Sequence, residues 1–193
     1  FETDAAVILD GGDGENAYRI GAGNYLQNIR GAVTILGGSQ VDELTIDDAD
    51  VVPVTGDLYQ FDRSSDARTG TFIHQRVLLP PLPGVLTSPL LSFSAVESAQ
   101  LDGNWSANDF VVHATPVGTD LTLRAWGGED QFRLETADRF SIGGGNYLNH
   151  IGGEVTVFGE AIGNLIIDDR NNQAGDVHDV RFGGILGAVK KGR

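Results

Sequence analysis

The sequence contains a duplicated segment, and this repetition limits the folds that the chain can adopt. Residues 21–48, GAGNYLQNIRGAVTILGGSQVDELTIDD, align with residues 143–169, GGGNYLNHIGGEVTVFGEAIGNLIIDD, with one residue deleted in the second copy. The copies share GNYL, the isoleucine after it, VT and a closing IDD. Repetition of this kind is typical of folds that stack similar structural units on one another.

Short β-type runs recur along the whole chain, whereas helical periodicity is hard to find. The runs are rich in Val, Ile, Leu and Thr and are closed by turn-forming residues: AVILD, AVTILG, ELTID, DFVVHA, LTLRAW, EVTVFG and LIID. Close spacing of such runs indicates an all-β chain with frequent turns.

A shorter motif, an acid or amide followed by an apolar anchor, recurs inside and outside the duplication. Alignment of its copies puts one Asn or Asp in a single column, which contains Asn16, Asp42, Asn108, Asp130 and Asn164. The anchors that follow are Tyr18, Leu44, Phe110, Phe132 and Leu165. Successive anchors are 26, 66, 22 and 33 residues apart. A step of 22 to 26 residues matches one coil of a three-sided parallel β-solenoid, and 66 is three times 22. We therefore expect an all-β, parallel β-solenoid built from degenerate coils.

The glycines and amides of this motif suit the corners of such coils. Glycine tolerates positive φ, and Asn or Asp stacked at one corner can hydrogen-bond from coil to coil without any ligand. The alternative fold is a tandem pair of β-sandwich modules. Continuous apolar runs such as VIL, FVV and LII favour strands that are buried more fully, as in the solenoid.

The length of 193 residues suits a single repeat-built β domain. Its Pro-rich segment, residues 78–93, is expected to be a loop that covers the flank of the fold, with an exposed self-association patch as the alternative. The tail RFGGILGAVKKGR would cap the last coil or bind an acidic neighbour. The expected parts are repeat unit A (6–50), a divergent middle with the Pro-rich insertion (51–100), repeat unit B (101–170) and the cap or tail (171–193).

Composition excludes several classes of partner and site. The chain has 13 basic and 27 acidic residues and a formal net charge of −14, so neither nucleic acid nor an anionic membrane is an expected partner. It has no cysteine, which excludes disulfides and zinc–thiolate sites. The most apolar stretch, residues 77–93, is shorter than the roughly 20 residues that a membrane-spanning helix needs, so we expect no membrane insertion.

The pattern Gly-Gly-x-Gly-x-Asn/Asp-x-apolar at residues 11–18, with a degenerate copy at 37–44, resembles a known repeat family. It is similar to the Gly/Asp-rich nonapeptide of the RTX, or haemolysin-type, calcium-binding repeats. The larger arrangement resembles the degenerate Gly/Asp-rich repeats of very large secreted bacterial surface proteins. The resemblance implies a structural calcium ion held between turns, with the ligand role falling on Asn16, Asp42, Asn108, Asp130 and Asn164.

Paired acids that end two of the strands offer a second place for a cation. Adjacent Asp residues point to opposite faces of a strand, so one of each pair could be an interior or ligand group. The alternative is that these acids end a strand and discourage edge pairing. With the acids of the first corner, the candidate calcium ligands are Asp10, Asp13, Asn16, Asp42, Asp47, Asp48, Asp130, Asp168 and Asp169.

No catalytic and no cofactor-binding residue is predicted. Asp47 and Asp48 could act as the carboxylate pair of a polysaccharide-cleaving β-helix, but catalytic groups are usually unique whereas these acids are duplicated. GAGNYL and GGGNYL lack the last glycine of a nucleotide-binding loop and no helix pattern follows them. The four histidines, His74, His113, His150 and His178, are scattered singly, as ordinary packed or surface residues are.

These features favour a non-catalytic structural, assembly or adhesion protein that is secreted or sits on a bacterial cell surface. Its expected partners are copies of itself or other envelope and extracellular proteins, bound through a repetitive acidic β scaffold. The alternative is a carbohydrate-binding or polysaccharide-cleaving β-helix protein.

Overall fold

The computed structural model confirms that the chain is all-β in the part that it describes. Its described residues form strands in two sheets and one short 3-10 helix, η1 (Leu26–Asn28). No helix within this part is long and apolar enough to cross a membrane. The described residues are 5–21, 26–49, 56–78, 84–88, 90–126, 130–134, 151–159, 164–167, 178–183 and 186–191.

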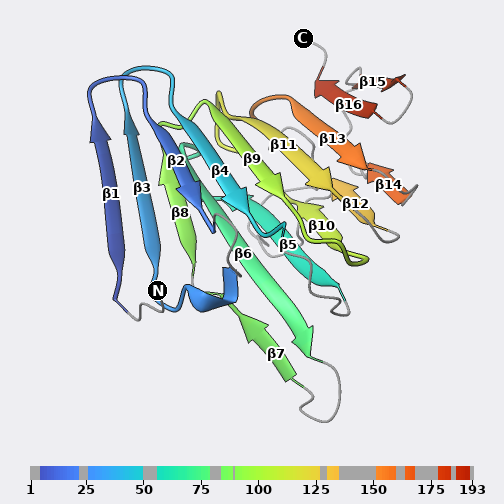
Figure 1. Ribbon diagram of the computed structural model, residues 1–193. Helices are drawn as coiled ribbons and strands as arrows, with labels where there is room; N and C mark the ends of the chain where they lie inside the picture. Colours follow the sequence, from blue (N-terminus) through green and yellow to red (C-terminus); the bar gives the residue numbers. More distant parts are fainter. Residues whose placement is uncertain are drawn as a thin grey trace.

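The two sheets lie face to face, as Figure 1 shows. Sheet 1 has the strand order β1 (Val7–Gly12), β3 (Val33–Gly38), β8 (Leu91–Ser94), β6 (Thr69–Leu78), β5 (Asp57–Arg63), β10 (Asp109–Val112), β12 (Gln131–Leu134) and β14 (Asn164–Ile167), and β7 (Gly84–Thr87) pairs with β6. Sheet 2 has the order β15 (His178–Gly183), β16 (Leu186–Lys191), β13 (Val155–Gly159), β11 (Asp120–Ala125), β9 (Ser98–Asp102), β4 (Glu43–Asp47) and β2 (Ala17–Ile20).

Successive units of the chain contribute one strand to each sheet and pair in parallel with the unit before. β1, β3 and β8 pair this way in sheet 1, and β2, β4, β9, β11 and β13 do so in sheet 2. The expected third side of each coil is not formed by the described residues, so that part of the prediction is wrong. The described residues between strands form corners instead, such as residues 26–32 with η1.

An antiparallel insertion interrupts this order in sheet 1. β5 and β6 form a hairpin that lies between β8 and β10, and β6 pairs antiparallel with both β5 and β8. The expected flank-covering loop is therefore wrong for the described part of residues 78–93, because β8 is an interior strand whose Leu91 and Phe93 are buried. Residues 79–83 and 89 lie outside the described residues. The tail forms the hairpin β15–β16, which pairs antiparallel with β13.

The two copies of the duplicated segment occupy opposite sheets. β3 lies in sheet 1 whereas its counterpart β13 lies in sheet 2, and β4 and β14 are exchanged in the same way. The predicted single column is therefore divided between the sheets, with Asn16 and Asp42 beside sheet 2 and Asn108 and Asp130 beside sheet 1. Asn164 pairs with Gln131 and so lies one residue out of register with the column.

The core between the sheets is built from alternate residues of each strand, those whose side chains point toward the other sheet. In sheet 2 these include Leu44, Ile46, Leu101, Leu121 and Leu123, each at most 1% exposed. In sheet 1 one row crosses four strands and consists of His74, Tyr59, Phe110 and Phe132, which we call the aromatic row. Its successive ring centroids are 5.3, 5.0 and 4.7 Å apart, close to the spacing of strands in a sheet. Stacked rings of this kind stabilise the sheet beyond the area that they bury.

Candidate functional site

A row of buried polar residues lies two residues before the aromatic row along the chain, where Asp57 begins β5, Asn108 precedes β10 and Asp130 precedes β12. The backbone N–H of Asp57 donates to Asn108 Oδ1 (3.1 Å), and the N–H of Asn108 donates to Asp130 Oδ1 (2.8 Å). The backbone N–H groups of Asp57 and Asn108 thus each donate to a side-chain oxygen of the equivalent residue in the neighbouring unit. We call this arrangement the corner ladder of sheet 1.

Sheet 2 has an equivalent ladder of side-chain-to-backbone hydrogen bonds, at the corner before β2 and β4. The N–H and the side-chain Nδ2 of Asn16 both donate to Asp42 Oδ1, at 2.8 and 2.9 Å. The N–H of Asp42 donates in turn to Glu97 Oε2 at 2.8 Å. The predicted hydrogen bonding of Asn and Asp from one coil to the next therefore exists, as two ladders in place of one.

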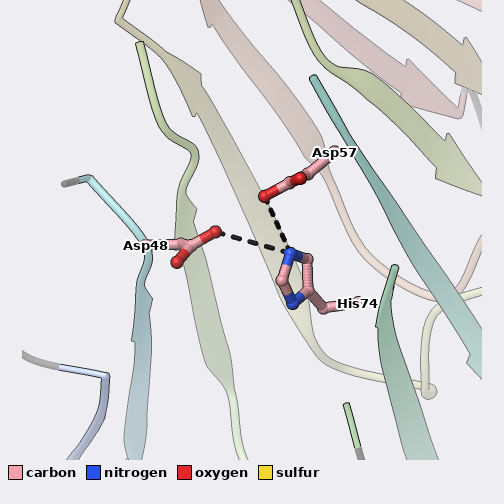
Figure 2. A group of neighbouring side chains, drawn as sticks. All are labelled: Asp48, Asp57 and His74. Carbon is pink, nitrogen blue, oxygen red and sulfur yellow. Dashed lines mark hydrogen bonds and ion pairs between the residues drawn. The ribbon is translucent and has the colours of Figure 1, made fainter. Parts of the chain in front are cut away.

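The ladder of sheet 1 ends in a buried cluster of charged and polar side chains, and Figure 2 shows three of its members. Asp48 follows β4, Asp57 begins β5, and His74 lies on β6. The cluster thus joins the end of a sheet 2 strand to the inserted hairpin of sheet 1. Its six members are at most 4% exposed: Asp48, Asp57, Tyr59, His74, Arg76 and Asn104.

Asp57 is the centre of this buried charged cluster. Arg76 donates from Nε to both of its carboxylate oxygens, at 3.0 Å each, and from Nη2 to Oδ2 at 2.6 Å. Asn104 Nδ2 donates to the same Oδ2 (2.8 Å), and His74 Nε2 lies 2.9 Å from it. Burial alone would raise the pKa of Asp57, but the hydrogen bonds from His74 and Arg76 hold that pKa below its usual value. Asp57 is therefore a carboxylate paired with a guanidinium.

Asp48 approaches the same imidazole from the other side. Its Oδ2 accepts a hydrogen bond from the Tyr59 hydroxyl (2.8 Å) and lies 3.6 Å from His74 Nε2. Its Oδ1 accepts the backbone N–H of Leu26 at 3.2 Å. Burial raises the pKa of Asp48, and the nearby His74 and Tyr59 offset this only in part. Burial, followed by the charges of Asp48 and Asp57, also raises the pKa of Tyr59 well above its usual value, so the phenol stays a donor.

Counting charges indicates that this cluster holds a proton. Among the described residues, two carboxylates and one guanidinium leave one negative charge in excess at a buried site, which is costly. One proton on the Asp48 carboxyl makes the cluster neutral. The raised pKa of Asp48 is the expected consequence of this excess charge and of burial.

A divalent cation fits the cluster poorly. Asp48, Asp57 and His74 offer three ligand atoms within 4.8 Å of one another, which is the spacing of a small metal site. Arg76, however, already occupies both oxygens of Asp57, and a dication beside it would leave a net positive charge. Calcium also prefers six to eight oxygen ligands, which this set does not supply.

The cluster is also closed to a substrate of any size. The cavity beside it has a volume of about 20 Å³ and is lined by Ile20, Leu26, Ile29, Val33, Phe72, Ser88 and Leu91. This apolar space has room for about one water molecule. The arrangement can therefore position a hairpin and hold a proton, but it cannot admit a sugar or a peptide.

The predicted calcium ligands lie in separate places. Asp10 and Asp13 line an open hollow of about 320 Å³ at the first corner, together with residues of the turn after β3. Asp13 Oδ1 accepts a hydrogen bond from Ser39 (3.1 Å), and Asp10 Oδ1 accepts the N–H of Gly12 (3.0 Å). Asp42 adjoins this corner, and its Oδ2 is buried without a hydrogen-bond partner among the described residues. Calcium binding at this corner stays a prediction.

The two acids at the end of β4, Asp47 and Asp48, point to opposite faces of the sheet. Asp48 points into the core, whereas Asp47 pairs with Arg19 at 2.5 Å on the outer face of sheet 2. Because the two carboxylates point to opposite sides, they do not form the pair that a glycosidase needs around one bond. Asp130 belongs to the ladder of sheet 1, while Asp168 and Asp169 lie outside the described residues.

Sequence reasoning missed most of the cluster. Asp57 and Tyr59 stand two residues apart in GDLYQF, which is the spacing of Asn108 and Phe110. This further copy of the acid-and-anchor motif was therefore a signal in the sequence for two members of the cluster. His74 and Arg76 lie on an antiparallel strand outside the repeat, and no spacing in the sequence connects them to Asp48.

Comparison of the chain with protein-family models, with curated proteins and with solved structures finds no match. The geometry of the described residues therefore carries the functional argument.

We expect the two cluster carboxylates to differ in their contribution to stability. Asp57→Asn removes the carboxylate that accepts three hydrogen bonds from the buried Arg76 guanidinium and should cost about 3–5 kcal/mol. Asp48→Asn imitates a protonated carboxyl and should cost about 1 kcal/mol at about pH 7.5. Urea denaturation followed by circular dichroism measures both values. Equal costs for the two variants would contradict the assignment of the proton to the Asp48 side of the cluster.

Asp130→Asn should stabilise the protein at neutral pH. Asp130 is fully buried, its Oδ2 has no partner among the described residues, and burial raises its pKa to about 6. Because the pKa of Asp130 is higher in the folded than in the unfolded chain, the contribution of Asp130 to stability is fully present below about pH 4. That contribution is lost as the pH rises through about 6. An amide avoids this loss, so the gain should approach about 3 kcal/mol near pH 7.5 and vanish near pH 4.

The matched control is Asp120→Asn. Asp120 also accepts a backbone N–H, from Glu154 at 2.7 Å, but its side chain is exposed. This variant should leave the free energy of unfolding unchanged within about 0.5 kcal/mol at both pH values. A pH-independent effect of Asp130→Asn would show that the buried charge is not the cause.

Proposed function

We propose that this chain is a non-catalytic scaffold module, a two-sheet β-solenoid that assembles with other copies of itself in an extracellular or cell-surface structure of a bacterium. The observation that carries the proposal is an incompletely covered end of the stack. Leu9 and Tyr18 point inward like their partners Ile35 and Leu44 in the next unit, which are 0% and 1% exposed. Leu9 and Tyr18 are only partly buried. A further coil placed on this end would complete their burial.

The backbone at this end also suits the addition of a strand. β1 is the last strand of sheet 1 among the described residues, and the N–H of Val7 donates to Ala32 of the neighbouring corner. Since successive residues of a strand point their N–H groups to alternate sides, the N–H of Ile8 points away from β3. The Ile8 side chain is 68% exposed. An open edge of this kind is a template for pairing with another chain.

The distribution of polar groups supports a structural role over catalysis. The corner ladders repeat one hydrogen bond along each sheet, which is how an architectural element is used. The buried charged cluster contains catalytic residue types, but its members are at most 4% exposed and its Asp57 is paired with Arg76. We therefore propose that its role is to fix the inserted hairpin against the end of β4.

Calcium, in this proposal, is a structural ligand of the first corner, where Asp10 and Asp13 line the same hollow. Calcium at about 1 mM should then raise the melting temperature by a few degrees over a chelator-treated sample. Asp13→Asn should reduce that difference, and Asp66→Asn, on an exposed turn between β5 and β6, should not. Identical melting temperatures with calcium and with chelator would remove calcium from the proposal.

Assembly through the open edge should depend on Ile8. Ile8→Pro removes an N–H that faces away from β3, so it blocks pairing with a second copy without breaking a bond between β1 and β3. Sedimentation velocity should find oligomers of the native chain, more of them at about 0.5 M than at about 0.15 M salt because the net charge of −14 is then screened. The Ile8→Pro variant should sediment as a monomer.

Ile8→Val is the control, since it keeps the N–H and the shape of the strand. It should assemble like the native chain. A native chain that remains monomeric at both salt concentrations, up to about 100 μM, would contradict the proposal.

A further inference from the structure

The only two tryptophans of the chain stack on each other at one corner of the molecule. Trp105 follows β9 and Trp126 follows β11, which are neighbouring strands of sheet 2. Their ring centroids are 6.3 Å apart with an angle of 27° between the planes. Trp105 is 49% exposed although it is a large aromatic residue. A half-exposed ring supported from below by a second ring is a rigid, flat apolar surface.

Trp126 extends the outward-facing residues of β11. Burial along this strand alternates, with Leu121, Leu123 and Ala125 buried and the residues between them more exposed. Arg124 and Trp126 therefore lie on the outer face of sheet 2. The Arg124 guanidinium lies 5.5 Å from the ring centre of Phe158 on the next strand, β13. The Phe158 ring thus lies beside Arg124 on this face, and Trp126 follows Arg124 by two residues along the chain.

Hydrogen-bonding groups accompany the rings. Asp102 pairs with Arg124 across the two strands, and its carboxylate lies 4.0 Å from Arg124 Nη1. Gln100 Nε2 donates to both oxygens of Asp102, at 3.1 and 2.9 Å. The Arg124 side chain is 40% exposed, so part of it is accessible from solvent. The face therefore offers a carboxylate acceptor, an amide and a guanidinium donor beside flat rings.

We propose that this face of sheet 2 binds a neutral polysaccharide of β-linked pyranoses, with one sugar ring stacked on Trp105. The C–H face of such a sugar is flat and apolar and packs on an aromatic ring, while its hydroxyls both donate to carboxylates and accept from guanidinium or amide groups. An anionic polymer is disfavoured because Asp47 and Asp102 lie in the same outward row and the net charge is −14. The site is distinct from the proposed assembly end, since it uses the outer face of the interior strands β9 and β11 and not the terminal strands β1 and β2.

Fluorescence gives a direct test, because both tryptophans lie in the proposed site. The native chain is titrated with cellohexaose, mannohexaose and xylohexaose, and with hexagalacturonate as the anionic comparison. We expect a saturable change in tryptophan emission with at least one neutral hexasaccharide and none with hexagalacturonate. Calorimetry of the same mixtures gives affinities that do not depend on a fluorophore. Trp105→Ala should weaken binding about tenfold or more, and Trp105→Tyr should keep it within about threefold.

Val117→Ala is the control, since Val117 is a 67% exposed apolar residue away from this face on the loop before β11. It should bind like the native chain, and all variants should melt like the native chain. Absence of saturable binding with all three neutral sugars, equal binding of hexagalacturonate, or unchanged affinity of Trp105→Ala would each overturn the proposal. Dissociation of oligomers by Trp105→Ala without any sugar binding would instead assign the face to contact between copies. None of these results bears on whether Ile8→Pro blocks assembly.

Discussion

The rest of the structure depends on the hydrogen bond by which a corner side chain of one strand accepts the backbone N–H of the strand before it. A buried N–H without a partner is costly, and a chain that turns a corner at every unit exposes such groups repeatedly. Asp42, Asn108 and Asp130 satisfy them with side-chain oxygens. The same bond also fixes register, because the residue two positions later then falls opposite its equivalent in the next strand. The aromatic row and the core of sheet 2 follow from that register.

Asp57 connects the inserted hairpin β5–β6 to the ladder of sheet 1. Its N–H belongs to the ladder of sheet 1, whereas its carboxylate belongs to the buried charged cluster. Its partners His74 and Arg76 come from β6, the antiparallel strand that the insertion adds. An ion pair with Arg76 specifies this strand pairing more strictly than apolar contacts, which tolerate a shift in register. His74 also extends the aromatic row by one ring, so both rows continue from the repeats into the insertion.

Sequence pattern was sufficient for most strands of the repeated units, their parallel pairing and the corner ladder, because the acid or amide and its apolar anchor recur. It did not predict the hairpin β5–β6 or the strands β7 and β8. It was not sufficient to assign strands to sheets. Asn16 and Asn108 look alike in sequence, yet they serve opposite sheets, since a two-residue spacing has the same form on either side of the core. The cluster was hidden for a different reason. Asp48 meets His74 only because β6 runs antiparallel beside β5, and long-range antiparallel pairing leaves no periodic signal.

The two proposed surfaces are geometrically compatible because they use different directions of the same fold. Strands add to a sheet along its hydrogen-bonding direction, so growth at β1 leaves the faces of both sheets uncovered. The row that contains Asp47, Asp102 and Arg124 runs along that same direction on sheet 2. Stacking further copies would therefore repeat the Trp105 face at regular intervals along a growing rod. Several weak sugar contacts on one rod would then act together, which converts modest single-site affinity into firm attachment.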